Sequence, residues 1–400
     1  MKIGIMTWWH NMNYGGFLQG VALQHFLVRE GFDAELVSFS SPRADTSVWH
    51  LLVSSRCDKL WMLPVWVAQM FRALFVRSGY FHRVERLKKT ARLFQRFAIA
   101  SPMLYKSVGE LDRDNRYDVL LVGSDQVWSP TLHDAEFSYL LGGVRDEIPK
   151  LSYASSVSAP TIHPYEQLYG NSLRRFKALS VREKSIIPEL EAITGRKIEW
   201  VVDPTLLLTK DEWVSYMDIN PRTSEQHITL YWLSGVEAHL DEILRFARRC
   251  KCRVHLFTEL GHFDVKMDVR EWPRYLIKRM KIFRASNLVW RLNADAKEFL
   301  SDIATSDCVV SDSFHAMMFA AIFNKSAQIV ITKSRQAMRS RIVDFVEVTG
   351  SARLIDGLDA AVGEGLLNVP SCLDLAEWIS NSKEFLISNL RKCISSGQGV

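Results

Sequence analysis

The hydrophobic pattern of the first half of the chain alternates between strands and helices. Residues 2–8 form an apolar, β-prone run, residues 17–29 carry apolar side chains at helical spacing, and residues 34–39 form a second apolar run. Further short apolar runs, each ending in polar residues, follow at 117–122, 151–155 and 179–182. Strands that alternate with helices in this way are typical of a parallel, doubly wound sheet.

A second alternation begins after a polar stretch that we interpret as a linker. It contains strand-like runs at 228–233, 253–257 and 307–310, and helix-like runs at 240–249, 294–304 and 316–323. The length of 400 residues also favours more than one domain. We therefore predict an α/β fold of two Rossmann-like domains facing a cleft. Its parts are an N-terminal domain over 1–208, a linker over 209–226, a C-terminal domain over 227–350, and a C-terminal segment with a helix over 351–400.

Composition and charge exclude several classes of protein. Hydrophobic residues make up 48% and charged residues 24%, which disfavours collagen-like, disordered and disulfide-scaffold chains. A formal net charge of +5 is small for a dedicated nucleic-acid binder. The six cysteines are scattered, and no Cys, His, Asp or Glu cluster has the spacing of metal ligands, so we expect reduced thiols and no metal.

Two apolar segments bear on membranes. Residues 2–9 are too short for the core of a signal peptide, and the uncharged run 60–71 is shorter than the roughly 20 residues that a spanning helix needs. A basic stretch follows at 72–96, which fits either a packed helix pair with a solvated basic face or contact with anionic lipid. We expect a cytoplasmic protein, with peripheral contact at the inner face of the plasma membrane as a further possibility.

Ligands of open parallel sheets bind beyond the carboxyl ends of the strands, so the polar residues at these ends form the candidate site. The loop Asn13, Tyr14, Gly15 and Gly16 precedes a helix, whose free N–H groups and dipole favour an anion. It is neither a Walker A loop nor a G-x-G-x-x-G fingerprint, which disfavours triphosphates and dinucleotides. The alternative is that the two glycines only form a tight turn.

Two further strand ends carry polar residues. Ser124 and Asp125 follow the buried run 117–122, either as site residues or as a turn in which Asp125 caps a helix. Ser313 and His315 lie at a strand-to-helix corner. An imidazole with an unperturbed pKa near 6.5 can give or take a proton at neutral pH, so we favour a functional role for this histidine.

Three arginines complete the candidate site. Arg182 ends the run 179–182, where its guanidinium could bind a carboxylate or phosphate through two parallel hydrogen bonds. The alternative is a surface ion pair with Glu183 or Glu189. Arg339 and Arg341 precede an apolar helical run and could reach the same cleft.

The ordered set of these segments resembles the polysaccharide pyruvyl transferase family. The stretches that carry the resemblance include VGSDQVW, LSYASS, LSVRE and VDPT, and they lie at 3–24, 117–130, 151–156, 179–183, 202–213, 307–325 and 341–345. The resemblance implies the glycosyltransferase B arrangement of two Rossmann-like domains. It also implies transfer of the enolpyruvyl carbons of phosphoenolpyruvate onto a sugar as a ketal, with release of phosphate.

The resemblance also implies roles for residues. By motif position, Arg182 and His315 hold the donor and are the catalytic pair, while Ser313, Arg339 and Arg341 are further donor-binding candidates. The acceptor side is expected to comprise Asn13, Tyr14, Gly15, Gly16, Ser124 and Asp125. No cofactor is expected besides phosphoenolpyruvate as co-substrate, and the acceptor is a sugar of a bacterial-type surface polysaccharide or its lipid-linked oligosaccharide precursor.

Two departures and two alternatives accompany this interpretation. Ala316-Met317 follows His315 where many relatives have Gly and a small residue, and Ser326-Ala327 follows Lys325 where Pro and an aromatic are usual. One alternative is a nucleotide-sugar-dependent glycosyltransferase, because the same architecture serves both chemistries. The other is a non-catalytic partner in envelope-polysaccharide assembly, with the basic stretches 60–96 and 266–291 as docking surfaces.

Overall fold

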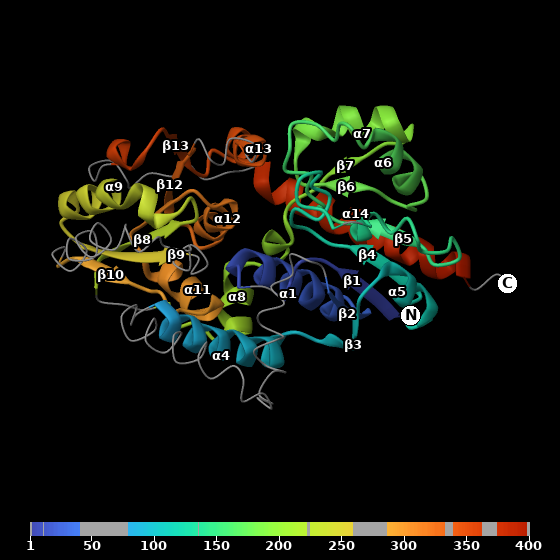
Figure 1. Ribbon diagram of the computed structural model, residues 1–400, viewed down its shortest axis with the longest axis horizontal. Helices are drawn as coiled ribbons and strands as arrows, with labels where there is room; N and C mark the ends of the chain where they lie inside the picture. The colour runs from blue at the N-terminus through green and yellow to red at the C-terminus, as the bar shows by residue number, and fades with distance from the viewer. Residues whose placement is uncertain are drawn as a thin grey trace, which may run out of the picture.

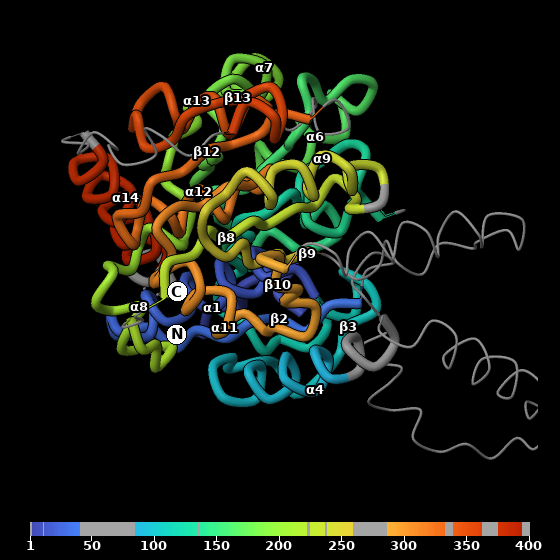
Figure 2. Tube along the Cα trace, turned by 90° about the vertical axis from the view of Figure 1, so that its left-hand side faces the viewer, coloured from blue at the N-terminus to red at the C-terminus, as the bar shows by residue number. Residues whose placement is uncertain are grey.

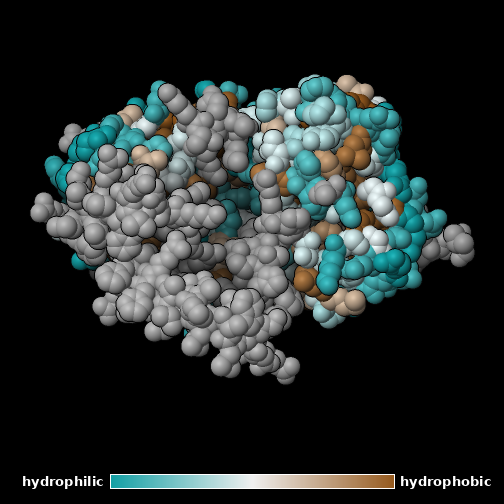
Figure 3. All heavy atoms as spheres, in the orientation of Figure 1, coloured by the Kyte–Doolittle hydropathy of each residue, from teal (hydrophilic) through white to brown (hydrophobic). Residues whose placement is uncertain are grey.

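The computed structural model consists of two α/β halves side by side, each built on a parallel sheet (Figure 1). The structure describes residues 2–10, 12–40, 79–134, 136–221, 225–258, 286–332, 339–361 and 374–397. The apolar run 60–71 and most of the basic segment 266–291 lie outside these residues. Between the two halves the surface is hollowed, with hydrophilic residues at the floor of the hollow (Figure 3).

The N-terminal sheet has the strand order β3-β2-β1-β4-β5, and all of its pairs are parallel. Its strands are β1 (Lys2–Met6), β2 (Asp33–Phe39), β3 (Ala100–Tyr105), β4 (Val119–Val122) and β5 (Lys150–Ser152). A short parallel pair, β6 (Ser180–Val181) and β7 (Glu199–Trp200), joins this layer through bridges from Leu151 to Ala178 and from Ser155 to Val181. Arg182 therefore leaves β6 at the same edge at which the residues after β4 emerge.

The C-terminal sheet has the order β10-β9-β8-β11-β12-β13, again with parallel pairs only. Its strands are β8 (His227–Trp232), β9 (Arg253–Thr258), β10 (Leu288–Trp290), β11 (Cys308–Ser311), β12 (Ser326–Val330) and β13 (Arg353–Ile355). In both sheets the order reverses next to the first strand, which opens a crevice at the carboxyl ends. The expected fold of two Rossmann-like domains is therefore confirmed.

Helices cover both sheets and close the space between them. They are α1 (Tyr14–Arg29), α4 (Gly79–Phe97), α5 (Val108–Arg113), α6 (Glu166–Leu173), α7 (Ile187–Thr194), α8 (Lys210–Met217), α9 (Val236–Arg249), α11 (Ala296–Thr305), α12 (Phe314–Ile322), α13 (Arg339–Thr349) and α14 (Asp374–Gly397). One hydrophobic core cluster contains residues of α1, α11 and α12 together. Burial of this shared apolar surface holds the two sheets in a fixed relation.

The expected linker 209–226 contains an ordered helix. Thr209 and Glu212 form a capping box at the start of α8, in which each side chain accepts from the backbone N–H of the other residue. Trp213 is fully buried, and its Nε1 donates to the carbonyl of Thr205 at 2.9 Å. The connection between the domains is therefore part of the core.

Two long helices tie the halves together. From the N-terminal half, α4 lies beneath α11 of the C-terminal half (Figure 2), and Lys89 donates to Glu298 at 2.9 Å. The C-terminal helix α14 returns to the N-terminal half, where Trp378 Nε1 donates to the carbonyl of Trp200 at 3.0 Å. The first turns of α14 therefore pack against β7, which pairs with the strand β6 that precedes Arg182.

Candidate active site

His315 enters the space between the halves from a sharp strand-to-helix corner. β11 ends at Ser311, Ser313 is the N-cap residue of α12, and the Ser313 N–H donates to Ser311 Oγ at 3.0 Å. His315 lies in the first turn of α12 and is buried. The corner therefore holds the imidazole at the carboxyl edge of the C-terminal sheet, as the sequence predicts.

Helix α1 of the opposite half approaches this imidazole at Gly15. The side chain of Asn13 caps α1 by accepting from the N–H groups of Gly15 at 2.9 Å and Gly16 at 3.4 Å. A Cβ atom placed on Gly15 would lie only 2.1 Å from His315 Nδ1. The close approach of the two domains at the histidine therefore requires glycine at this position.

We expect Gly15→Ala to displace the imidazole and to lower the turnover number about 10²-fold, as misplacement of a reacting group by about 1 Å can do. The added methyl should also reduce the free energy of unfolding by about 1–3 kcal/mol. The matched control is Gly109→Ala in α5, where the nearest atom to a new Cβ is 3.9 Å away. Equal turnover of both variants would contradict the role given to Gly15.

Tyr14 serves the domain interface. Its hydroxyl donates to the carbonyl of Ala294 at 2.8 Å, and its ring stacks on Phe299 with centroids 4.6 Å apart. The guanidinium of Arg86 lies 4.2 Å from the centre of the same ring. Burial raises the pKa of Tyr14 to about 12. These contacts occupy the side chain, so we leave Tyr14 out of the acceptor site.

Arg182 and Asp203 form a buried ion pair behind His315. Arg182 Nη1 lies 3.0 Å from Asp203 Oδ2, which also accepts from Ser124 Oγ at 2.9 Å. Thr205 donates to the other carboxylate oxygen through its N–H at 3.0 Å and its hydroxyl at 2.9 Å. Burial alone would raise the pKa of Asp203, but His315, Arg182 and the Thr205 hydrogen bonds lower it. Asp203 is therefore an ionised anchor that fixes Arg182.

Asp125 faces the same guanidinium from a strained backbone. Its φ of 75° is in the left-handed region, which is uncommon for a residue other than glycine. Asp125 Oδ1 accepts from the Gln126 N–H at 2.9 Å and lies 3.5 Å from Arg182 Nη2. No helix begins here in the part of the chain that the structure describes, so the alternative of a helix cap is wrong.

Arg341 reaches the site from the C-terminal half. It is buried, and its Nη1 donates to Ser158 Oγ at 3.0 Å. With the Gln126 amide oriented to satisfy both of its atoms, the amide oxygen accepts from Nη1 at 2.9 Å and from Nη2 at 3.0 Å. Arg339, two residues earlier at the start of α13, is exposed. The structure therefore brings Arg341, and not Arg339, into the buried part of the site.

Phe314 brings the two guanidinium groups together. The Arg182 Cζ lies 4.8 Å and the Arg341 Cζ 5.4 Å from the centre of its ring. Cations at such distances are attracted by the ring, which holds two like charges in one apolar setting. Arg182 comes from the N-terminal half and Arg341 from the C-terminal half, so the site depends on both.

The surroundings keep His315 neutral. Burial is the main cause that lowers its pKa to about 4, and Arg182 and Arg341 act in the same direction. Asp203 and Asp125 oppose the shift. His315 Nε2 lies 3.7 Å from Asp203 Oδ2, beyond hydrogen-bond distance. At neutral pH the site therefore offers an imidazole with a free lone pair, which can accept a proton.

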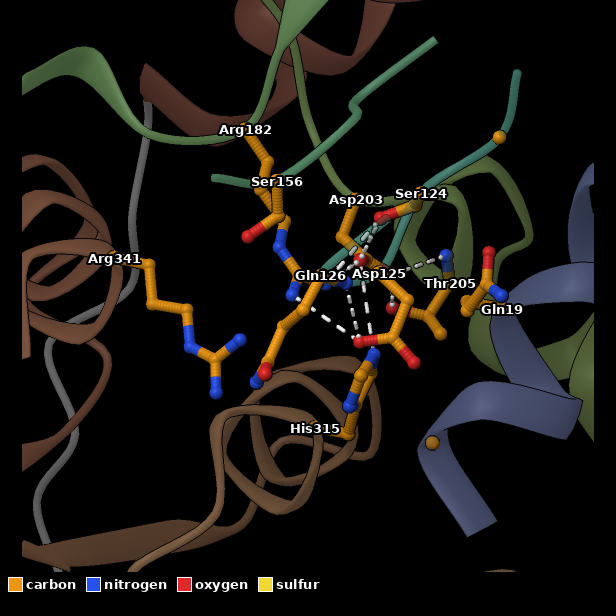
Figure 4. Close-up of polar contacts among 12 residues, drawn as sticks. Gln19, Ser124, Asp125, Gln126, Ser156, Arg182, Asp203, Thr205, His315 and Arg341 are labelled. Carbon is orange, nitrogen blue, oxygen red and sulfur yellow. Dashed lines mark hydrogen bonds and ion pairs between the residues drawn. The ribbon is translucent and has the colours of Figure 1, made fainter. Parts of the chain in front are cut away.

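Several buried polar atoms of the site lack a partner. Among the described residues, nothing hydrogen-bonds to Arg182 Nε, Arg182 Nη2 or His315 Nε2. Buried polar groups are normally satisfied, so such atoms in a native site point to a missing ligand. Figure 4 shows Arg182, Arg341 and His315 converging on one space from three elements. Two arginine forks and unused N–H donors favour an anionic ligand with several oxygen atoms.

Sequence reasoning missed several members of this site. Asp203 ends the predicted strand 198–202, so the strand-end rule applied to the other segments would have found it. Gln126 lies in the same strand-end segment as Ser124 and Asp125 and carries the same signal, whereas the roles of Phe314 and Ser158 come from contacts between separate elements.

A second polar cluster, away from the strand ends that form the site, was also missed. His227, His255 and Asp302 bring ligand-type atoms within 4.8 Å of one another. Both nitrogens of His227 lie near backbone carbonyl oxygens, at 3.3 Å from Glu225 and 3.2 Å from Asp302, a setting that favours protons on both. Burial opposes the charged form, but hydrogen bonds to Asp302 raise the pKa of His227. The cluster thus fits a buried ion pair better than a metal site.

Solved structures with the same two-domain fold have very different sequences. The UDP-GlcNAc 2-epimerase from Neisseria meningitidis, bound to UDP-GlcNAc, is 11% identical, with a TM-score of 0.52 over 98% of this chain and 100% of that one. A putative UDP-N-acetylglucosamine 2-epimerase from Listeria monocytogenes is 10% identical, with a TM-score of 0.55 over 96% and 90%. These similarities concern the fold alone and confirm the expected arrangement, like that of glycosyltransferase B.

The family follows from a wider match of the sequence. A search of curated proteins gives no significant match. The family model of polysaccharide pyruvyl transferases, however, matches residues 13–327, which include Arg182, Asp203 and His315. The chain therefore belongs to the polysaccharide pyruvyl transferase family.

Proposed function

We propose that this protein transfers the pyruvyl group of phosphoenolpyruvate to a sugar of a surface polysaccharide or its lipid-linked precursor, forming a ketal and releasing phosphate. The observation that carries the proposal is the convergence of two buried guanidinium groups, one from each half, on a neutral histidine with unpartnered nitrogens nearby. Membership of a family named for pyruvyl transfer to polysaccharides supports the same reading.

The donor fits the charges of the site. Phosphoenolpyruvate carries a carboxylate and a phosphate on the same carbon atom, C2, and each group suits a planar guanidinium fork. Arg182 and Arg341 would bind these two groups, and Ser313 at the α12 corner could supply a further contact. Arg339 at the rim could attract the donor without touching it. No cofactor is required for this chemistry.

The neutral state of His315 suggests how the first bond forms. A sugar hydroxyl oxygen bonds to C2 of the donor, its proton passes to His315, and the C2–C3 electron pair takes that proton onto C3, which becomes a methyl group. A relay of this kind needs an unprotonated imidazole at the start, which burial and the two arginines provide. The C2–phosphate bond then breaks, and its electron pair leaves with the phosphate oxygen.

The acceptor would lie against the N-terminal half. Asn13, Gly15 and Gly16 place the start of α1 beside the imidazole, and Asp125 lies beyond Arg182. Ser124 contributes by holding Asp203. In this arrangement the sugar would meet His315 on one side and Asp125 on the other.

A transfer assay tests the proposal directly. The purified protein is incubated with phosphoenolpyruvate labelled in its carbon atoms and with an extract of cells that lack this protein, which supplies the native acceptor. We expect label in acid-labile ketals on polysaccharide or lipid-linked sugar, together with equimolar phosphate release. Label transfer from a nucleotide-sugar instead would favour the glycosyltransferase alternative.

Helix α4 supports peripheral contact with a membrane. No helix among the described residues is long and apolar enough to span one. Lys88, Arg92 and Arg96 are exposed at intervals of four residues and so share one face of α4. We expect binding to vesicles containing anionic lipid that is lost at high salt, and weaker binding of a Lys88→Glu/Arg92→Glu variant. Equal binding to neutral vesicles would contradict this surface.

A further inference from the structure

Ketal formation leaves one proton without an assigned acceptor. Two sugar hydroxyls bond to C2 of the donor, so two hydroxyl protons must leave. In the pathway proposed above, His315 moves the first proton to C3. The second hydroxyl loses its proton as its oxygen bonds to C2, after the bond between C2 and the phosphate oxygen has broken and while the phosphate is still in the site. A second base would assist this step.

Asp125 and Asp203 face the guanidinium of Arg182, and Glu183 follows Arg182 in the chain. Asp203 is fully buried, and both of its oxygens accept hydrogen bonds from Arg182, Ser124 and Thr205. Glu183 is buried under the hydroxyls of Ser156 and Ser158, which both donate to its Oε1. Both residues are 2% exposed, so neither carboxylate is accessible to a sugar, although Glu183 Oε2 accepts no hydrogen bond from the described residues.

Asp125 differs from both in exposure, and from Asp203 also in bonding. Its side chain is 13% exposed, against 0% for Asp203 and 1% for Arg182. Its Oδ1 contacts the Gln126 N–H and Arg182, while Oδ2 accepts no hydrogen bond from the described residues. Figure 4 shows the carboxylate of Asp125 beside the imidazole of His315, in the space that Arg182 and Arg341 also face.

The backbone at Asp125 supports a role in the site. A φ of 75° is strained in a residue other than glycine, and such strain concentrates at functional sites. The strained turn aims the side chain at Arg182 and His315 instead of along the strand β4. Asp203, Arg182, Asp125 and Arg341 are the charged groups that most affect the pKa of His315.

We propose that Asp125 is the second catalytic base of this protein, which accepts the proton of the second sugar hydroxyl as the ketal closes. The second hydroxyl oxygen bonds to C2, its O–H electron pair stays on that oxygen, and the proton passes to Asp125 Oδ2. Asp125 then gives this proton to the departing phosphate, which leaves as hydrogen phosphate, and the carboxylate is restored. This inference rests on the proposed pyruvyl transfer.

The test is Asp125→Asn, a change that keeps the shape and the tolerance for left-handed backbone. Its two readouts are the dissociation constant for phosphoenolpyruvate by calorimetry and the rate of label transfer into an extract of cells that lack this protein. Removing a negative charge 3.5 Å from Arg182 should tighten donor binding several-fold. Loss of the base should lower the transfer rate by about 10²–10⁴-fold. If Asp125 had only a structural role, its replacement would not strengthen phosphoenolpyruvate binding while it slows label transfer.

The outcomes separate this inference from the proposed function. Asp359→Asn is the control, because Asp359 pairs with Arg245 on the surface of the C-terminal half. If the wild-type protein transfers label and the Asp125→Asn variant transfers it at the same rate, the role of Asp125 is wrong but the proposed pyruvyl transfer is not. Weaker donor binding together with a slower rate would also overturn it, since Asp125 would then only position Arg182. A wild-type protein that neither binds the donor nor transfers label would overturn the pyruvyl transfer itself.

Discussion

His315→Ala should lower the rate of pyruvyl transfer by roughly 10²–10⁴-fold while the protein stays folded, because it removes the group that moves a proton to the donor. The imidazole makes no hydrogen bond through Nε2 to the described residues, so its loss leaves no buried partner unsatisfied. Donor binding should persist, since Arg182 and Arg341 are untouched. Transfer rates and donor dissociation constants, measured on the same preparation, check both expectations.

A matched histidine provides the control for this variant. His239 is half-buried on α9, where its Nδ1 lies 3.0 Å from Glu242. His239→Ala should transfer pyruvyl groups at the wild-type rate. If His315→Ala retained the same rate as His239→Ala, His315 would have no part in the reaction.

Substitutions of Arg182 should have the largest effect on the affinity for phosphoenolpyruvate. Arg182→Ala removes the partner of Asp203 and leaves a carboxylate buried, which should cost about 3–5 kcal/mol of stability and could prevent folding. Arg182→Lys avoids this outcome because it keeps the charge. An ammonium group cannot reproduce the planar fork, and loss of one charged hydrogen bond, about 1.5–3 kcal/mol, should weaken phosphoenolpyruvate binding by about 10–100-fold.

Calorimetry on folded Arg182→Lys checks this expectation, with thermal unfolding recorded to establish the fold. The control is Arg245→Lys, which alters an exposed pair with Asp359. An unchanged dissociation constant in Arg182→Lys would remove this residue from the donor site.

Much of the fold could be predicted from the sequence, because each short apolar run is a buried strand and each polar strand end marks the same edge of a sheet. This logic brought Arg182, Asp125 and His315 to one place, where the structure also has them. It gave the stretch 209–226 as a linker and did not predict the helix α8 within it, although Thr209 and Glu212 have the spacing of a capping box.

The contacts between the domains could not be predicted in this way. Tyr14 looked like a residue of the acceptor loop, yet its ring packs in the interface and its hydroxyl bonds across it. The meeting of Arg182 and Arg341 at Phe314, and the approach of Gly15 to His315, depend on how two sheets and their helices pack. The residues that meet across the two halves lie more than a hundred positions apart in the sequence, and the spacing of apolar residues along the chain does not predict which distant residues touch.

The central proposal is a donor site built by both halves of the molecule. Titration of the wild-type protein with phosphoenolpyruvate tests this proposal most directly. We predict saturable binding at one site per chain, with weaker binding to both Arg182→Lys and Arg341→Lys, since each half supplies one guanidinium. A folded protein that binds no phosphoenolpyruvate but binds UDP would contradict the account, as would donor binding that neither substitution changes.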